Sequence, residues 1–343
     1  MNCKRKKVKK TYKGVSKMRI LIIGGTRFIG RHVVPELLYQ GHQLILLNRG
    51  NHELPWVNAD IEQAHCDRDD AVGFKAKMAQ LRFDVVIDMI LYNARQAEEA
   101  VVALQGMCQH YFMLSTRSVY AGNVTSPIRE SDHLETNPEV AYGFNKAQAE
   151  QVLLRAHQQQ GFPATILRLP AVYGEYDYQI RERYFIKRFL DKRTQMLLPD
   201  GGCGVNQREY AGNIAAQLAF LLQKPESIGQ IYNTGHAKVQ TYRALVEEAM
   251  SIMSHHATLY SVPTPLFPAV PDLAAPRVHM HSTGKLEALR WMERYSIREG
   301  LSRTITWLRQ EPDEILPTHR NKSFHFDYAL EDEVIASRGV LLG

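Results

Sequence analysis

The chain has 343 residues, of which 45% are hydrophobic, so it is long enough to form two domains or one elaborated α/β domain. It has no apolar stretch approaching about 18 residues and no apolar segment typical of a secretion signal. These absences argue against a membrane-spanning helix and predict a cytoplasmic protein. The four cysteines lie far apart in the sequence, so neither a disulfide framework nor a cysteine metal site is expected.

The formal net charge of +6 is concentrated at the amino terminus. Residues 1–17 contain eight Lys and Arg residues and no acidic residue, which leaves 34 basic and 36 acidic residues in the rest of the chain. A segment so rich in like charge is predicted to be a disordered tail. Nucleic acid is therefore not expected as a partner, except through this tail.

Residues 18–50 predict a strand, a glycine turn, a helix and a second strand. The apolar run 20–23 is followed by Gly24 and Gly25, and apolar residues then recur at helical spacing over 28–39. The two glycines permit a sharp turn, and the positive amino-terminal end of the helix suits a pyrophosphate. Such a turn can also be a plain connection between a strand and a helix, so further motifs are needed to interpret it.

The rest of the chain continues the alternation of strands and helices. Buried strands are predicted at 43–47, 84–88, 111–114 and 164–169, and helices at 95–107 and 141–160. This order predicts an α/β fold, a doubly wound Rossmann-type parallel sheet with a smaller carboxyl-terminal α+β region for the substrate. The expected divisions are a Rossmann domain over 18–173, completed by parts of 205–250, a substrate region over 174–330, and a carboxyl-terminal tail over 331–343. The stretch 324–333 is expected to end in a short helix that could serve as a packing arm.

A hydroxyl and a Tyr-Lys pair are the strongest candidates for catalysis. Thr116 follows the predicted strand 111–114, and Tyr142 and Lys146 lie near the start of the helix 141–160. Their spacing of four places Tyr142 and Lys146 on one helix face. A nearby ammonium stabilises phenolate, so we expect Lys146 to lower the pKa of Tyr142 toward the range of a general acid or base. Thr116 is expected to hold the substrate oxygen.

Four segments in this order resemble the extended short-chain dehydrogenase/reductase family: GGTRFIG from residue 24, LSTRSVYAG from 114, YGFNK from 142 and RLPAVYGEYD from 168. The resemblance covers residues 18–250. It implies an NAD(P)-dependent oxidoreductase or epimerase acting on a secondary alcohol or ketone, such as that of a nucleotide-linked sugar. It assigns catalysis to Thr116 and Tyr142, and makes Lys146 hold the nicotinamide ribose. Dehydration is disfavoured because dehydratase relatives carry Asp-Glu after the threonine, where this chain has Arg117-Ser118.

The resemblance also implies which residues line the cofactor: Gly24, Gly25, Arg27, Phe28, Ile29, Gly30, Asn48, Arg49, Asp67, Arg68 and Lys146. An acidic residue after the second strand favours NAD, whereas arginine accommodates the 2′-phosphate of NADP. The chain has Asn48-Arg49 there, so NADP is the predicted cofactor and NAD the alternative. Arg27 replaces the middle glycine of the family's turn. It either binds a phosphate by a bidentate contact or marks a member that has lost the cofactor.

The sequence of the carboxyl-terminal half gives fewer indications of function. Arg208 resembles the arginine that grips the substrate diphosphate in nucleotide-sugar relatives. Residues 181–193 contain six basic residues among apolar ones and predict an amphipathic helix with a basic outer face. The pairs His255-His256 and His279-Met-His281 lack a supporting Cys or carboxylate pattern, so no metal site is expected. A small-molecule substrate and a homodimer are the expected partners.

Two alternatives stay open. The chloroplast stem-loop RNA-binding proteins share GGTRFIG with arginine in the same place, which points to an RNA-binding protein on the same fold. A cofactor sensor without turnover is the other alternative. The Tyr142-Lys146 pair and the nearly neutral charge of the chain beyond residue 17 favour the enzyme.

Overall fold

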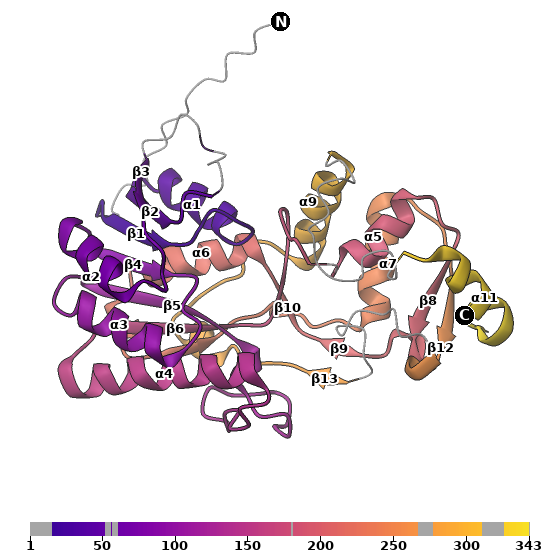
Figure 1. Cartoon of the computed structure of the whole chain (residues 1–343). Helices are drawn as coiled ribbons and strands as arrows, with labels where there is room; N and C mark the ends of the chain where they lie inside the picture. Colours follow the sequence, from indigo (N-terminus) through magenta and orange to yellow (C-terminus); the bar gives the residue numbers. More distant parts are fainter. Residues whose placement is uncertain are drawn as a thin grey trace, which may run out of the picture.

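The structure is a computed structural model that describes residues 16–51, 56, 61–179, 181–266, 277–310 and 326–342. Almost all of the predicted basic tail therefore lies outside the described residues. No helix of the described chain is long and apolar enough to cross a membrane. The described helices and strands form two parts that lie side by side (Figure 1).

The first part is built on a seven-stranded sheet in the order β11-β6-β5-β4-β1-β2-β3, with every neighbouring pair parallel. The strands are β1 (Arg19–Ile23), β2 (Gln43–Asn48), β3 (Ile61–His65), β4 (Val85–Asp88), β5 (His110–Thr116), β6 (Ala164–Leu169) and β11 (Ile231–Asn233). The Rossmann-type α/β fold predicted from the alternating pattern is confirmed.

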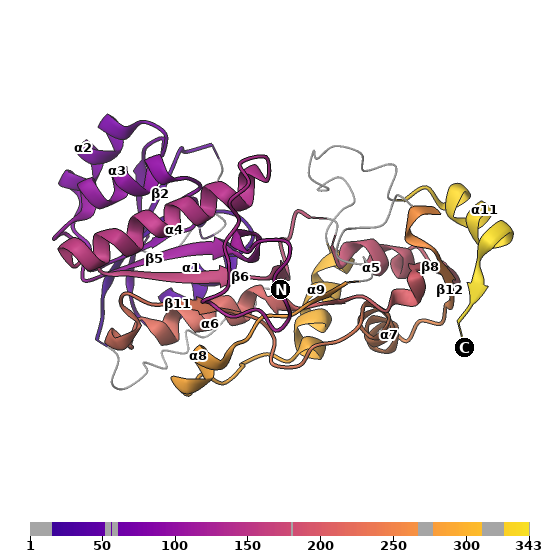
Figure 2. The ribbon, with the colours of Figure 1, turned by 90° about the horizontal axis from the view of Figure 1, so that it is seen from below.

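Helices cover both faces of this sheet, as Figure 2 shows. They are α1 (Gly30–Tyr39) and α6 (Ala211–Leu221) on one face, and α2 (Ala71–Gln80), α3 (Ala94–Leu104) and α4 (Ala141–Gln160) on the other. Successive side chains of a strand point to opposite faces, so Ile20 and Ile22 enter one core while Leu21 and Ile23 enter the other. This two-sided burial is why β1 is apolar throughout.

The second part has a separate core around a sheet in the order β14-β12-β8. Its elements are α5 (Arg183–Leu190), β8 (Gln195–Pro199), α7 (Tyr242–Met253), β12 (Thr258–Val262), α9 (Ile297–Gln310), α11 (Tyr328–Arg338) and β14 (Val340–Leu341). Two short parallel pairs run between the parts, β7 (Ala171–Tyr173) with β10 (Arg208–Tyr210), and β9 (Val205–Asn206) with β13 (Val278–His279). The short helix α8 (Gly284–Ala288) packs instead against the first part, where it contacts β11 and buries Leu286 in the core shared with α1 and α6.

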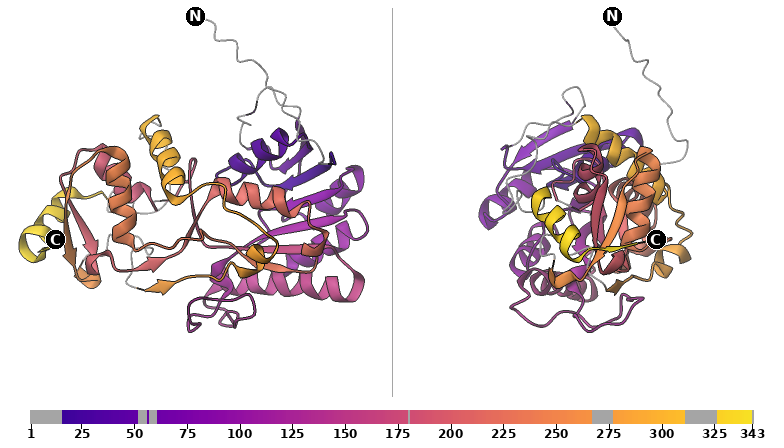
Figure 3. Two further views of the ribbon diagram at one scale, coloured as in Figure 1. Left: turned by 180° about the vertical axis from the view of Figure 1, so that it is seen from behind. Right: turned by 90° about the vertical axis from the view of Figure 1, so that its right-hand side faces the viewer.

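Residues 331–342, expected as a tail, form most of α11 and all of β14. Helix α11 and strand β14 belong to the second part, at its far end in Figure 3. Glu331 is fully buried and accepts hydrogen bonds from Arg188 of α5, at 3.0 Å from its Nε atom. Ile335 is buried in the same core, and β14 pairs with β12. A buried ion pair with a distant residue leaves no periodic signal in the sequence, so these contacts could not be predicted from it.

Candidate functional site

A cleft of about 790 Å³ opens at the carboxyl edge of the large sheet. Because the strands are parallel, the residues that follow β1, β2, β3, β4, β5 and β6 gather at this edge. The cleft is lined by these predicted site residues: Gly24, Gly25, Arg27, Phe28, Ile29, Gly30, Asn48, Arg49, Asp67, Arg68, Thr116, Tyr142 and Lys146. The structure thus brings together every predicted site residue except Arg208.

The glycine turn has the geometry of a phosphate cradle. Gly25 has φ +84°, a conformation that L side chains rarely adopt, and a Cβ atom on Gly30 would lie 2.2 Å from the carbonyl oxygen of Gly25. No side chain caps the amino terminus of α1. The positive end of that helix therefore faces the cleft without an internal anion, and the turn fits the pyrophosphate of a dinucleotide.

Arg27 points toward the catalytic half of the cleft. Its guanidinium lies over the ring of Tyr178, 4.4 Å from the ring centroid. Its charge acts on Tyr92, whose ring is 5.1 Å from the Lys146 ammonium. The Arg27 side chain therefore lies beside Tyr178 in the lining of the cleft.

The residues after β2 and β3 differ in what they offer a ligand. Arg49 is exposed at the cleft, and the Oδ1 atom of Asn48 accepts a hydrogen bond from the backbone N–H of Gly50 at 2.7 Å. Asp67 is also exposed. Arg68 is buried, and its Nη2 atom donates to the carbonyl oxygen of Gln96 at 2.6 Å. Arg68 thus forms a wall of the cleft, while Arg49 and Asp67 are accessible.

Thr116 and Tyr142 meet at the catalytic end of the cleft. Partial burial of the Tyr142 phenol raises its pKa above the ordinary value, and a hydrogen bond with the Thr116 side chain opposes this rise. The rise differs from the expectation that Lys146 lowers this pKa. At neutral pH Tyr142 is therefore protonated and able to donate to an oxygen held at Thr116.

Lys146 lies deeper than Tyr142, although both are on α4. Its Nζ atom donates to the carbonyl oxygen of Leu114 at 2.8 Å, and the side chain is buried. Burial lowers the pKa of Lys146 to about 8, against the opposing carboxylates of Asp88 and Glu150. The ammonium is thus directed at the end of β5, which explains why it does not lower the pKa of Tyr142.

The structure shows a buried ion pair behind Lys146 that was not predicted from the sequence. Glu150 follows Lys146 by one helical turn and accepts a hydrogen bond from Ser115. Arg168 of β6 donates to Glu150 from its Nη2 atom at 2.6 Å. The spacing of four from Tyr142 through Lys146 to Glu150 places Glu150 on the same helix face, but the spacing does not indicate its partner Arg168 on β6. The pair fixes the strand end that carries Thr116.

Arg208 does not reach the cleft. Its Nε atom donates to Glu182 at 2.6 Å, its Nη1 atom donates to the carbonyl oxygen of Asn206 at 2.8 Å, and the side chain is buried. The prediction that Arg208 grips a substrate is therefore not supported by this arrangement. Arg117 and Arg181 line the cleft instead.

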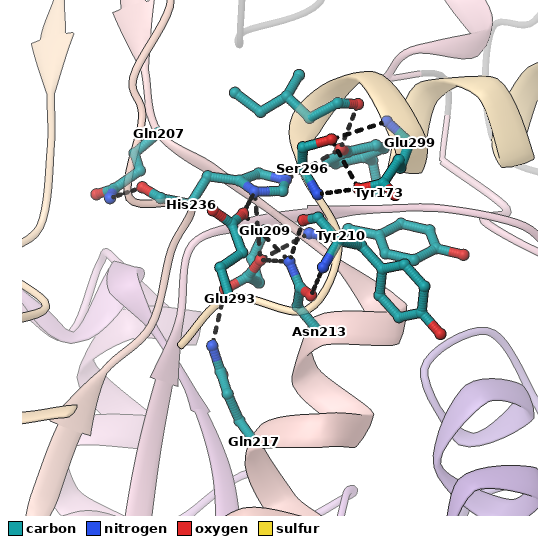
Figure 4. Close-up of polar contacts among 12 residues, drawn as sticks. Tyr173, Gln207, Glu209, Tyr210, Asn213, Gln217, His236, Glu293, Ser296 and Glu299 are labelled. Atoms are coloured by element: carbon teal, nitrogen blue, oxygen red, sulfur yellow. Dashed lines mark hydrogen bonds and ion pairs between the residues drawn. The ribbon is translucent and has the colours of Figure 1, made fainter. Parts of the chain in front are cut away.

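A second polar cluster joins the two parts, as Figure 4 shows. Ligand atoms of Glu209, His236 and Glu293 lie within 4.8 Å of one another. The Glu209 carboxylate already accepts from the side chains of Asn213 at 3.0 Å and Gln217 at 2.9 Å. Because these bonds and one from the Tyr210 backbone occupy its oxygens, we interpret the cluster as an ion-pair network rather than a metal centre. Its acids and histidine come from three distant segments, so the sequence gives no signal for it.

Three sequence relatives illustrate the range of similar proteins. The chloroplast stem-loop binding protein of 41 kDa b from Arabidopsis thaliana is 28% identical over 246 residues, 68% of this chain and 62% of the relative, which is less than two thirds of its length. A putative UDP-glucose 4-epimerase from Methanocaldococcus jannaschii is 26% identical over 319 residues, 84% of this chain and 98% of the relative. Human dTDP-D-glucose 4,6-dehydratase is 23% identical over 323 residues, 85% of this chain and 90% of the relative. Sequence similarity alone thus does not separate epimerases from dehydratases.

Solved structures share the fold. An epimerase from Methanothermobacter thermautotrophicus superposes with a TM-score of 0.71 at 18% identity, covering 86% of this chain and 93% of its own. A UDP-glucose 4-epimerase from Thermotoga maritima also gives 0.71, at 19% identity, with 85% and 99% covered. The profile of the NAD dependent epimerase/dehydratase family matches residues 20–235, more than half of the chain. The chain therefore belongs to the NAD dependent epimerase/dehydratase family.

Proposed function

We propose that this protein is an NAD(P)-dependent reductase or epimerase acting on a secondary alcohol or ketone of a nucleotide-linked sugar or a similar metabolite. One observation carries the proposal. Thr116, Tyr142 and Lys146 line the same cleft as the glycine turn, so proton transfer and a dinucleotide site lie together. The sugar-nucleotide substrates named for several relatives support the substrate class.

The cofactor, when bound, supplies or accepts the hydride. Thr116 positions the reacting oxygen, and Tyr142 gives it a proton in the reductive direction and removes that proton in the oxidative one. Lys146 holds the nicotinamide ribose and keeps positive charge beside the reaction centre. Arg117 and Ser118 stand where elimination of water would need an acid and a base, so we propose reduction or epimerisation without dehydration.

The direct test is turnover. We expect one of a panel of UDP- and dTDP-sugars to change the absorbance of reduced nicotinamide or to be converted to its epimer, as judged by chromatography. A ligand that co-purifies with the protein, identified by mass spectrometry, would select the panel. If no 4-keto or 4-hydroxy sugar nucleotide is converted with either cofactor, the proposed substrate class is wrong.

The cofactor preference gives a second test. The β2 end carries Arg49 and no carboxylate, so we expect NADPH to bind more tightly than NADH. A charge-assisted contact with the 2′-phosphate is worth about 1.5–3 kcal/mol, or about ten- to a hundredfold in affinity. Calorimetric titrations of both cofactors measure it.

Arg49→Gln should remove the preference, and the exposed Arg338→Gln of α11 serves as the control. Equal affinity in the unaltered protein would contradict the assignment of Arg49. We extend the proposal to a cytoplasmic homodimer, which light scattering of the purified protein and cell fractionation would check.

RNA binding is the second candidate function. The observation that favours it is the 28% identity to the chloroplast stem-loop binding protein. The charge of the chain opposes it, because Lys and Arg exceed the acidic residues only when residues 1–17 are counted.

A further inference from the structure

The loop 175–178, which we call the strap, is tied to the glycine turn and to the first turn of α1. The guanidinium of Arg27 lies 4.4 Å from the ring centroid of Tyr178, and that of Arg31 lies 3.6 Å from that of Tyr176. The His32 ring bonds to the carbonyl oxygen of Glu175 at 3.1 Å. The strap thus makes the same kind of contact twice, because both Tyr176 and Tyr178 carry an arginine guanidinium over the ring.

The two arginines differ in where they lie. Arg27 and Tyr178 line the cleft, whereas Arg31 and Tyr176 are not among the residues that line it. Tyr176 is instead held from the second part of the molecule by Trp307 of α9, at 5.4 Å between ring centroids. Only the Arg27–Tyr178 pair is therefore placed to meet a cleft ligand.

Arg27 also has its hydrogen-bonding capacity unused. It makes no hydrogen bond or ion pair with any residue in the described part of the chain, and its guanidinium lies over the Tyr178 ring. A guanidinium held over an aromatic ring keeps N–H donors that can bind a phosphate bidentately. Arg27 is thus a cationic donor placed beside the cleft by its contact with Tyr178.

We propose that Tyr178 is a positioning residue for the dinucleotide, holding Arg27 with its N–H edge toward the cofactor pyrophosphate. The proposal rests on the proposed function. It assigns Arg27 to the pyrophosphate rather than the 2′-phosphate, because Arg27 belongs to the turn that cradles the pyrophosphate and points toward Tyr92 and Tyr178. Arg49 is left to the 2′-phosphate. The arginine thereby replaces the close backbone approach that a glycine would permit at this position.

The experiment titrates NADH and NADPH into the full chain and into four single variants, Tyr178→Leu, Tyr178→Phe, Arg27→Leu and Arg31→Leu. Losing the oriented cation should weaken both cofactors by the same factor, about tenfold, in Tyr178→Leu and in Arg27→Leu. Tyr178→Phe keeps the ring and should bind like the unaltered protein. Arg31→Leu removes the matched contact outside the cleft and should also bind normally. Thermal unfolding of each variant reports whether it is folded.

The double variant Arg27→Leu/Tyr178→Leu tests the coupling. If Tyr178 acts through Arg27, the double variant should lose no more affinity than either single variant. Normal binding by a folded Tyr178→Leu, or full additivity in the double variant, would overturn the positioning role. A loss confined to NADPH would overturn the pyrophosphate assignment. If the unaltered protein bound neither cofactor, the proposed function itself would be overturned.

Discussion

At the scale of single residues, Tyr142 and Lys146 show how one helix face can hold groups of opposite environment. Four residues separate them, yet Tyr142 is exposed to the cleft and Lys146 is buried against the end of β5. Desolvation, partial for the phenol and complete for the ammonium, shifts both pKa values in favour of the neutral form, up for Tyr142 and down for Lys146. The pKa values of Tyr142 and Lys146 thus depend on desolvation more than on attraction between the two groups.

Tyr142→Phe removes only the hydroxyl group. We expect this variant to bind cofactor normally and to lose most of its turnover, because a positioned acid or base contributes about 10²–10⁴-fold. Tyr92→Phe is the matched control, since Tyr92 also lines the cleft and its ring is retained. Steady-state rates on the identified substrate measure both. Retention of more than about a tenth of the activity by Tyr142→Phe would contradict the assigned proton transfer.

At the scale of elements, the strap contains a carboxyl group whose burial makes the fold pH-dependent. Burial raises the pKa of Asp177 to about 7 from 3.8, although Arg181 lies 3.5 Å away and opposes the rise. Between these two pH values the folded protein keeps a proton that the unfolded chain has lost. The contribution to stability is therefore full below pH 3.8 and is lost as the pH rises toward about 7. The slope reaches about 1.4 kcal/mol per pH unit.

Asp177→Asn should remove this pH dependence, because an amide cannot ionise and its oxygen can still accept from the Gln179 N–H. We expect the variant to gain stability relative to the unaltered protein as the pH rises from about 4 to 7, and the difference to level off above that range. Urea unfolding across this range measures it. Asp69→Asn, at an exposed carboxylate, is the control. A difference that does not vary with pH would show that Asp177 titrates normally.

The elements that could be predicted are those with a local signal. The predicted helix 141–160 has the bounds of α4, since Gly161 with φ +67° ends it in the left-handed conformation. The strand predicted at 84–88 is β4, shortened by one residue. The burial of Glu331 in α11 could not be predicted, because its partner Arg188 lies in a distant helix.

At the scale of the molecule, the cleft could be predicted from the sequence, but the contacts between the two parts could not. Parallel strands deliver the residues after β1, β2, β4 and β5 to one edge whatever their sequence distance, so the glycine turn and Thr116 were expected together. Arg208 and His236 instead depend on ion pairs formed when the two parts meet. A family motif located Arg208 in the sequence but carried no information on its partner Glu182.

The charge of the whole molecule separates the enzyme from an RNA-binding protein. The basic segment 181–193 offers little unpaired positive charge, because four of its six basic side chains have acidic partners, among them Arg181 with Asp177 at 3.5 Å. Lys187 pairs with Asp191 at 3.0 Å, Arg188 pairs with Glu331 at 3.0 Å, and Arg193 pairs with Asp332. The excess of positive charge therefore lies in residues 1–17.

We expect any binding of a structured RNA to be weak, steeply dependent on salt and lost when the chain begins at Met18, because the remaining residues have more acidic than basic side chains. The shortened chain should still bind cofactor, since β1 begins at Arg19. Isotherms for both ligands at two salt concentrations measure this. A full-length variant with the eight basic residues of the tail replaced by Gln is the matched control. RNA binding by the shortened chain that survives about 200 mM salt would instead place the RNA site on the folded part and favour the alternative function.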